Sequence, residues 1–232
     1  MKLCIGSYNL QHGAGDLPDL SRIAANIVQS GMEVVGLQEI DQMTDRVGGI
    51  DTMKALSKST QYPYYAFFKA FPYKGGEYGL GILSKYPILK TERFELESNG
   101  YEQRVLGYAC IDVHGTPLPF FVTHVSYEDK PTRSVQLAQI AEILKLYHNY
   151  ILTGDFNTFD FAEYVAFSDA QTVNREGRFS VTFPQGQVSI DNIVYRADAW
   201  SFDAPQVITE SYSDHYALYA HGSRLNEDPK QQ

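Results

Sequence analysis

The sequence has few cysteines, no long apolar run and no apolar leader. Its 232 residues include two cysteines, Cys4 and Cys110, which are too few for a scaffold stapled by several disulfides. No stretch approaches the roughly 18 consecutive apolar residues that a membrane-spanning helix needs. Apolar residues 3–5 give way at once to residues 6–9 (GSYN), so the N-terminus shows no apolar region of a signal peptide. We therefore expect no transmembrane segment.

Both cysteines lie within apolar runs that are typical of buried strands. We expect them to be free thiols in the core, and a cytoplasmic location fits such thiols. Secretion is the alternative if a leader peptide has been removed from the chain.

Basic residues are few and scattered. Lys and Arg number 19 against 28 Asp and Glu, which gives a net charge of −9 at pH 7. No two basic residues are neighbours and none falls between Lys145 and Arg175, so the sequence shows no basic stripe that would grip a polyanion. Nucleic acid is therefore not the favoured partner. A metal ion with a few placed Arg and His residues would still allow the chain to bind a phosphate.

The remaining composition is that of a folded protein. Hydrophobic residues make up 44% of the chain and charged residues 20%, which excludes a disordered or collagen-like protein. Apolar residues recur at helical spacing from Leu20 to Val28 and, after Pro131, from Leu137 to Leu144. The spacing predicts a helix at each place.

Short apolar runs bounded by turn residues predict a series of strands. They cover residues 2–10, 33–38, 64–70, 79–84, 88–96, 105–113, 119–125, 150–153, 190–195 and 216–220. Hairpins and crossovers both occur, so we expect an α/β (α+β) fold, a four-layered sandwich of two mixed β-sheets packed face to face with helices outside. A single domain is expected over residues 1–221, followed by a polar C-terminal tail over 222–232.

Polar residues stand at the ends of these apolar strands or interrupt them. Taken singly, each is most often a turn former, a solvated edge or a structural histidine. Together they supply four carboxylates, two amides and two histidines at the places where such folds put a binding crevice. The set is Asn9, Glu39, His124, Asp155, Asn157, Asp191, Asp214 and His215.

An ordered series of short motifs spans the chain from its first strand to its last. The motifs are residues 8–13 (YNLQHG), 36–40 (GLQEI), 79–88 (GLGILSKYPI), 123–124 (TH), 154–158 (GDFNT), 190–194 (IDNIV) and 213–215 (SDH). In this order the sequence resembles the endonuclease/exonuclease/phosphatase superfamily. The resemblance implies metal-dependent hydrolysis of phosphoesters, the chemistry of nucleases, sphingomyelinases and inositol phosphatases.

The resemblance also implies a metal site. Glu39 would be the main Mg²⁺ ligand, with Asn9 and Asp214 completing the metal environment directly or through water. Hard oxygen ligands suit Mg²⁺ or Mn²⁺, and neither cysteine is placed for a zinc site.

Further residues would act on the phosphate and the water. Asp155 would orient or deprotonate the attacking water, and Asn157 would hold the phosphate. His215 would contact the phosphate or the water, while Asp191 fixes its tautomer. These roles come from the resemblance and from the need to neutralise charge on the phosphoryl oxygens.

A second carboxylate and imidazole pair is implied by Glu102 and His124. Arg104 follows closely and would contact the substrate. Arg46, in the loop after Glu39, could also reach a substrate phosphate, although a surface position is an equal alternative for it, as a solvated loop is for Glu102.

Aromatic residues in loops beside the motifs could stack on a base or pack on a lipid headgroup or sugar. They are Tyr73, Tyr78, Tyr101, Tyr127, Phe159 and Phe161.

The favoured function is a Mg²⁺-dependent phosphoesterase that hydrolyses a phosphodiester or phosphomonoester bond of a small or lipid-linked substrate by metal-assisted attack of water. Short loops with no basic insertion argue against a grip on duplex nucleic acid. A DNA or RNA nuclease is the first alternative. A non-catalytic binding module on the same fold is the second. The oligomeric state is open.

Overall fold

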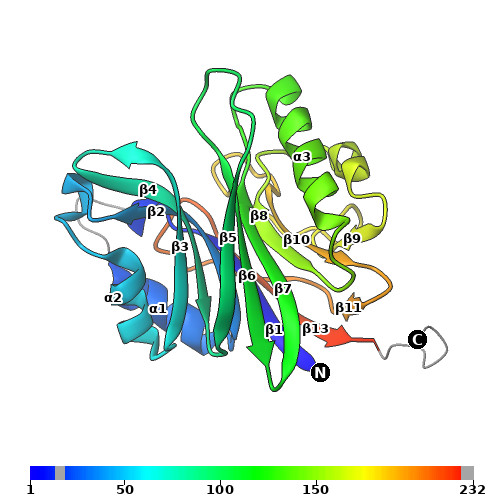
Figure 1. The fold of residues 1–232 in the computed structure, drawn as a ribbon, viewed down its shortest axis with the longest axis horizontal. Coiled ribbons are helices and arrows are strands. Elements are labelled where there is room, and N and C mark those ends of the chain that lie inside the picture. The colour runs from blue at the N-terminus through cyan, green and yellow to red at the C-terminus, as the bar shows by residue number, and fades with distance from the viewer. Residues whose placement is uncertain (14–18, 226–232) are drawn as a thin grey trace.

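A computed structural model describes residues 1–13 and 19–225 of the chain. Two β-sheets pack face to face at the centre, with α1 and α2 on one outer face and α3 on the other (Figure 1). The predicted four-layered sandwich is confirmed. No helix within the described ranges is both long and apolar enough to span a membrane.

The elements follow one another along the chain with short connections. In order they are β1 Lys2–Asn9, η1 Gln11–Gly13, α1 Leu20–Gln29, β2 Val34–Gln42, η2 Asp45–Val47, α2 Thr52–Thr60, β3 Tyr64–Tyr73, β4 Gly76–Ser84, β5 Ile88–Glu95, β6 Val105–Val113, β7 Thr116–His124, α3 Lys130–Leu144, β8 Ile151–Asp155, η3 Phe161–Ala166, β9 Ala170–Thr172, β10 Asp191–Arg196, β11 Trp200–Phe202, β12 Gln206–Ile208 and β13 Ala217–Arg224.

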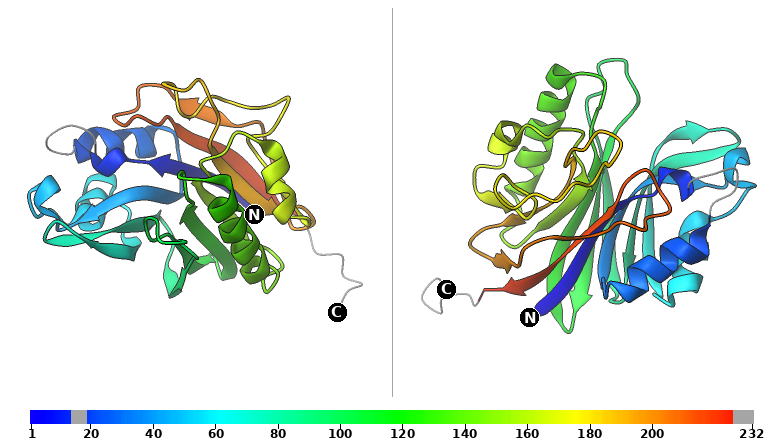
Figure 2. Two further views of the ribbon diagram at one scale, coloured as in Figure 1. Left: turned by 90° about the horizontal axis from the view of Figure 1, so that it is seen from above. Right: turned by 180° about the vertical axis from the view of Figure 1, so that it is seen from behind.

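Both sheets are mixed. The first has the strand order β11-β13-β1-β2-β4-β3, with β12 also paired to β13, and the second has the order β5-β6-β7-β8-β10-β9. The pairs β1–β2 and β7–β8 are parallel, whereas the other pairs are antiparallel. Strands β1 and β13, from opposite ends of the sequence, lie side by side (Figure 2).

Three apolar clusters hold the layers together. One fills the space between the two sheets, a second lies between the first sheet and the helices α1 and α2, and a third lies between the second sheet and α3. Phe120 and Phe121 show how one strand serves two clusters. Phe120 enters the inner cluster and Phe121 the outer one, because successive side chains of a strand point to opposite faces.

The predicted strands and both predicted helices are present, with shifted boundaries. Strand β13 continues to Arg224, because its last residues pair with β1 and β11, so residues 222–224 belong to the sheet and not to the predicted tail. Residues 226–232 of that tail lie outside the described part of the chain. Helix α2 was not predicted, since it buries only two apolar residues, Met53 and Leu56, in a polar segment capped by Asp51.

Gly36 lets the two sheets approach each other near the centre of β2. A Cβ atom at this position would overlap the hydroxyl of Thr153, on β8 of the opposite sheet. The Thr153 hydroxyl is itself fixed, since it donates a hydrogen bond to the carbonyl of Phe121 at 3.2 Å. The close contact therefore depends on a residue without a side chain.

We expect Gly36→Ala to lower the free energy of unfolding by about 1–3 kcal/mol, the usual cost of overpacking a core. Combined with Thr153→Ala, which removes the colliding hydroxyl, it should cost less than the sum of the two single changes. Urea unfolding of the two single variants and the double variant measures this coupling. Strict additivity would show that the Thr153 hydroxyl does not limit the approach of the sheets.

Candidate active site

The second sheet sets three candidate residues in a row across adjacent strands. His124 at the end of β7 is the register partner of Asp155 at the end of β8, and Asp155 is the register partner of Asp191 at the start of β10. Residues paired in this way point to the same face of a sheet. All three side chains are buried, with Asp155 and Asp191 each 1% exposed.

The first sheet brings Glu39 to the same place through a β-bulge. Gln38 and Glu39 together oppose Leu80 of β4, because the register shifts between Leu37 and Ile40. Glu39 has a φ angle of 58°, in the left-handed region that residues with side chains seldom adopt. Bulges of this kind re-aim a side chain, and strained backbone is often kept at functional sites.

Asn9, at the end of β1, joins the two sheets. Its Nδ2 donates hydrogen bonds to Glu39 Oε1 at 3.1 Å and to Asp155 Oδ2 at 3.0 Å. Its Oδ1 accepts a hydrogen bond from the backbone N–H of Gln11 at 3.0 Å. The amide of Asn9 therefore holds both carboxylates and is itself held by the loop that follows β1.

His215 enters from the loop before β13. Its Nδ1 lies 2.8 Å from Asp191 Oδ2, and its Nε2 lies 3.6 Å from Asp155 Oδ2. The ring of Phe183 packs against the imidazole with 5.1 Å between ring centroids. Asp191 thus lies where it can fix the orientation of the imidazole.

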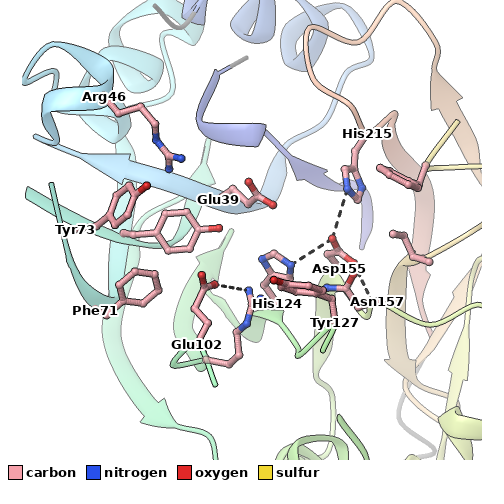
Figure 3. Close-up of a pocket in the computed structure, with 14 residues that line it drawn as sticks. Glu39, Arg46, Phe71, Tyr73, Glu102, His124, Tyr127, Asp155, Asn157 and His215 are labelled. Atoms are coloured by element: carbon pink, nitrogen blue, oxygen red, sulfur yellow. Dashed lines mark hydrogen bonds and ion pairs between the residues drawn. The ribbon is translucent and has the colours of Figure 1, made fainter. Parts of the chain in front are cut away.

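Asp155 is the centre of this arrangement. Besides Asn9 and His215, it receives a hydrogen bond from the backbone N–H of Asn157 at 2.9 Å and faces His124 Nε2 at 3.5 Å. Figure 3 shows His124 and His215 converging on this carboxylate, with Asn157 beside it. Donors from both sheets and from two loops surround it.

Burial and neighbouring charges shift the pKa values of these groups in different directions. Burial and the neighbouring Asp191 charge raise the pKa of Asp155 to about 7, although His215 opposes the shift. Burial would lower the pKa of His215, but the charges of Asp191 and Asp155 outweigh it and raise that pKa to about 10. Burial, reinforced by Arg104 and His215, holds the pKa of His124 well below its usual value. At neutral pH one imidazole is charged and the other is neutral.

These residues open into a pocket of about 400 Å³. Its lining residues are Glu39, Arg46, Phe71, Tyr73, Tyr78, Glu102, Arg104, His124, Tyr127, Asp155, Asn157, Phe183, Ile190 and His215 (Figure 3). Asn9 and Asp191 are not among these residues, but they bond to three of them, Glu39, Asp155 and His215. Asp214 is half-buried beside it, where the hydroxyl of Ser213 donates a hydrogen bond to its carboxylate at 3.3 Å.

The implied pair of Glu102 and His124 was wrong. Glu102 forms an ion pair with Arg104, at 3.2 Å, and His124 faces Asp155 instead. Glu102 lies before β6, where the arginine two residues along competes for its carboxylate, whereas the parallel register of β7 and β8 places His124 beside Asp155. Arg46 is also ion-paired, with both carboxylate oxygens of Asp41 at 2.7 and 2.8 Å. It still lines the pocket.

Three of the six aromatic residues expected in loops beside the motifs line the pocket, although Tyr73 and Tyr78 lie in strands β3 and β4. Tyr73, Tyr78 and Tyr127 line the pocket, whereas Tyr101, Phe159 and Phe161 do not. Phe71 and Phe183 line it and were not predicted. Phe71 could have been found, because it stands two residues before Tyr73 in a strand and such residues share a face.

Two groups of side chains could hold a metal ion. Glu39 and Asp214 offer carboxylate oxygens and form no ion pair with Lys or Arg within the described residues. Burial raises the pKa of Glu39, and the charge of Asp214 adds to the rise, so a cation there would relieve a repulsion. Asp155, Asp191 and His215 form a second cluster with ligand atoms within 4.8 Å of one another. In that cluster His215 Nδ1 already bonds Asp191, so a shared proton accounts for the closeness.

The model of the endonuclease/exonuclease/phosphatase family matches residues 6–215. The chain belongs to this family. Its members are hydrolases that act on phosphoester bonds, which confirms the prediction of an esterase at that level. No curated protein matches the sequence significantly.

Solved structures share the fold at low sequence identity. An endonuclease/exonuclease/phosphatase from Beutenbergia cavernae DSM 12333 has a TM-score of 0.81 and 20% identity, over 99% of this chain and 73% of that one. A mannosyl-6-phosphatase from Bacteroides thetaiotaomicron VPI-5482 has a TM-score of 0.73 and 18% identity, over 97% and 100%. D. rerio TDP2, complexed with a single-strand DNA product, has a TM-score of 0.74 and 20% identity, over 96% and 99%.

The raised pKa of His215 predicts how stability depends on pH. Because the folded-state value of about 10 exceeds the unfolded value of 6.5, the stabilisation is complete below pH 6.5 and is lost as the pH rises towards 10. For protein treated with a chelator, we expect the free energy of unfolding to fall by roughly a few kcal/mol over that range. The fall should be smaller in His215→Gln, as measured by urea unfolding at a series of pH values. Equal falls in both proteins would assign the titration to another group.

Proposed function

We propose that the protein is a Mg²⁺-dependent phosphoesterase that hydrolyses a small or lipid-linked phosphoester, with Mn²⁺ as an alternative metal. The observation that carries the proposal is the environment of Asp155. A buried carboxylate with a pKa of about 7 lies beside one charged imidazole, one neutral imidazole and the amide of Asn9. This combination suits the transfer of a proton near neutral pH.

Asp155 is the proposed base. Its Oδ1 is held by the Asn157 N–H, while its Oδ2 faces the two imidazoles, so the carboxylate has a fixed orientation towards the pocket. It would take a proton from the attacking water as the bond from water oxygen to phosphorus forms. The bond from phosphorus to the leaving alcohol breaks, the alcohol takes up a proton from solvent, and Asp155 returns to solvent the proton that it took from the water.

The remaining polar residues would stabilise charge on the phosphoryl group. His215, kept charged by Asp191, presents Nε2 to the pocket as a donor. Asn157 lines the pocket and is fixed by its donation to the Val125 carbonyl at 3.0 Å. Donors that are oriented before the reaction lower the energy of the transition state without a cost of reorganisation.

Glu39 and Asp214 would hold the metal ion. Bound Mg²⁺ supplies Lewis-acid polarisation of the phosphoryl oxygens. Asn9 takes a positioning role in this proposal, because its Oδ1 is engaged by Gln11 and its Nδ2 holds the Glu39 carboxylate.

A small substrate fits the pocket better than a nucleic acid chain. A volume of about 400 Å³ is at the small end of ligand pockets, and the net charge of −9 opposes long-range attraction of a polyanion. The mannosyl-6-phosphatase and TDP2 structures mark the two alternatives within this fold. A hydrolysis screen in MgCl₂ across sugar phosphates, nucleotides, phospholipids and oligonucleotides tests the choice. Preferred cleavage of oligonucleotides, with a steep dependence of binding on salt, would favour a nuclease.

Glu39→Gln should weaken activation by Mg²⁺ and lower kcat/KM about 100-fold or more, since a catalytic metal supplies several kcal/mol. Glu142→Gln, at an exposed glutamate near the end of α3, is the matched control and should leave activity unchanged. Initial rates over a range of MgCl₂ concentrations measure both effects. An unchanged Mg²⁺ dependence in Glu39→Gln would move the metal site elsewhere.

Asp191→Asn and His215→Ala should each reduce kcat by about 10²–10⁴, the usual contribution of a positioned acid or base. Their effects should not add in the double variant, because Asp191 acts through His215. Asp203→Asn, at an exposed aspartate, is the control. A double variant that loses the product of the two single effects would show that the residues act independently.

A further inference from the structure

The pocket has a second half that the proposed chemistry does not use. Phe71 and Tyr73 of β3, with Tyr78 of β4, form an aromatic wall. Figure 3 places Phe71 and Tyr73 across the pocket from His215, with Glu39 between them. A phosphate held at His215 would therefore have the aromatic wall on the opposite side of the pocket, with room between them for its ester group.

The aromatic wall is fixed in place by the loop that follows β2. The backbone N–H of Asp45 donates a hydrogen bond to the carbonyl of Lys74 at 2.7 Å, and the guanidinium of Arg46 lies 4.8 Å from the ring centroid of Tyr73. Gly76 permits this contact, because a Cβ atom there would overlap the carbonyl of Gln42. The hairpin and the loop are thus joined by a hydrogen bond, a cation–π contact and close backbone packing.

The charges in this half are balanced. Arg46 is paired with both oxygens of Asp41, and Arg104 is paired with Glu102. Lys74 lies 5.2 Å from the ring centroid of Tyr73, but it is exposed and solvent screens it. The cations that line this half among the described residues are thus paired, so a second anionic group on the substrate would meet the Glu102 carboxylate and aromatic faces.

The pocket nevertheless offers polar groups for hydroxyls. Glu102 is an acceptor at the rim, with a side chain 36% exposed. Arg104, which lines the pocket and is 4% exposed, holds this carboxylate in an ion pair at 3.2 Å. A substrate hydroxyl can donate to the Glu102 carboxylate.

The aromatic rings do not form a slot for a planar base. Phe71 and Tyr73 are inclined at 86°, and Phe71 and Tyr78 at 36°, so no two faces lie parallel. A puckered ring packs its C–H bonds on a single aromatic face. The inclined faces, the paired charges and the Glu102 acceptor together suit a ring that carries hydroxyl groups.

We propose that the aromatic wall, with Glu102 and Arg104, is a subsite for an uncharged hydroxylated ring, such as a sugar or cyclitol, esterified to the scissile phosphate. The inference rests on the proposed function, since it names the alcohol that the hydrolysis releases.

Matched substrates test the subsite. Wild-type protein in MgCl₂ should give a higher kcat/KM for glucose 6-phosphate than for glycerol 3-phosphate, which lacks a ring. Phe71→Leu should lower the ratio of the two kcat/KM values about tenfold, by removing the stacking face. Phe159→Leu is the control, because Phe159 is 66% exposed and lies outside the pocket, and it should leave the ratio unchanged.

The balanced charges of the subsite allow a second, independent test. Glu102→Gln leaves Arg104 unpaired, so kcat/KM for fructose 1,6-bisphosphate relative to glucose 6-phosphate should rise by about fivefold. The proposal is overturned if Phe71→Leu leaves the substrate ratio unchanged, or if wild-type protein prefers adenosine 5′-monophosphate or the bisphosphate to glucose 6-phosphate.

A binding experiment separates the subsite from the proposed chemistry. Saturation-transfer NMR of methyl glucoside with chelator-treated protein should show transfer from aromatic protons in the wild type and in Phe159→Leu, and lose it in Phe71→Leu. If no phosphoester is hydrolysed but this transfer is seen, the proposed function fails and the subsite stands. Hydrolysis of glycerol 3-phosphate and glucose 6-phosphate at equal rates, without transfer, would mean that the subsite fails and the phosphoesterase stands.

Discussion

The burial of the Asp155 carboxylate is the constraint on which the rest of the site depends. A buried carboxylate is costly unless hydrogen-bond donors surround it, and here the donors come from both sheets and from separate loops. Asn9 contacts it from β1, Asn157 from the loop after β8, and His215 from the loop before β13. The sandwich that buries Asp155 therefore also assembles the groups that tune its proton affinity, so the packing of the fold and the chemistry of the site have one physical origin.

The candidate site was largely foreseeable because strand ends are foreseeable. Runs of apolar residues that stop at Asn9, His124 and Asp155 place polar groups at one edge, and the fold then brings them together. The contacts that loop residues make were harder to predict from the sequence. The ion pair of Glu102 depends on the conformation of its loop, which the sequence does not give. The bulge that orients Glu39 cannot be recognised from the pattern of apolar residues. Helix α2 was not predicted for a similar reason, since tertiary contacts stabilise it and its sequence shows little helical periodicity.

An acidic chain can present a phosphate site because charge is arranged locally. Arg46 and Arg104 are each compensated by a neighbouring carboxylate, and Asp191 balances the charged His215. Among the described residues at the pocket, the carboxylates of Glu39 and Asp214 form no ion pair with Lys or Arg, and a divalent cation is a suitable counterpart for them. The net charge of −9 therefore describes the surface seen from a distance, whereas the pocket is governed by pairs only a few ångströms apart.

The pairing of β1 with β13 has a consequence for the order of folding. Asn9 ends β1 and His215 precedes β13, so the two residues lie far apart in the sequence, yet both contact Asp155. The carboxylate and its donors are therefore in place only once β13 has docked against β1. Domains that depend on such long-range pairing fold slowly. A partly folded chain, in which these two strands have not yet paired, lacks the assembled site.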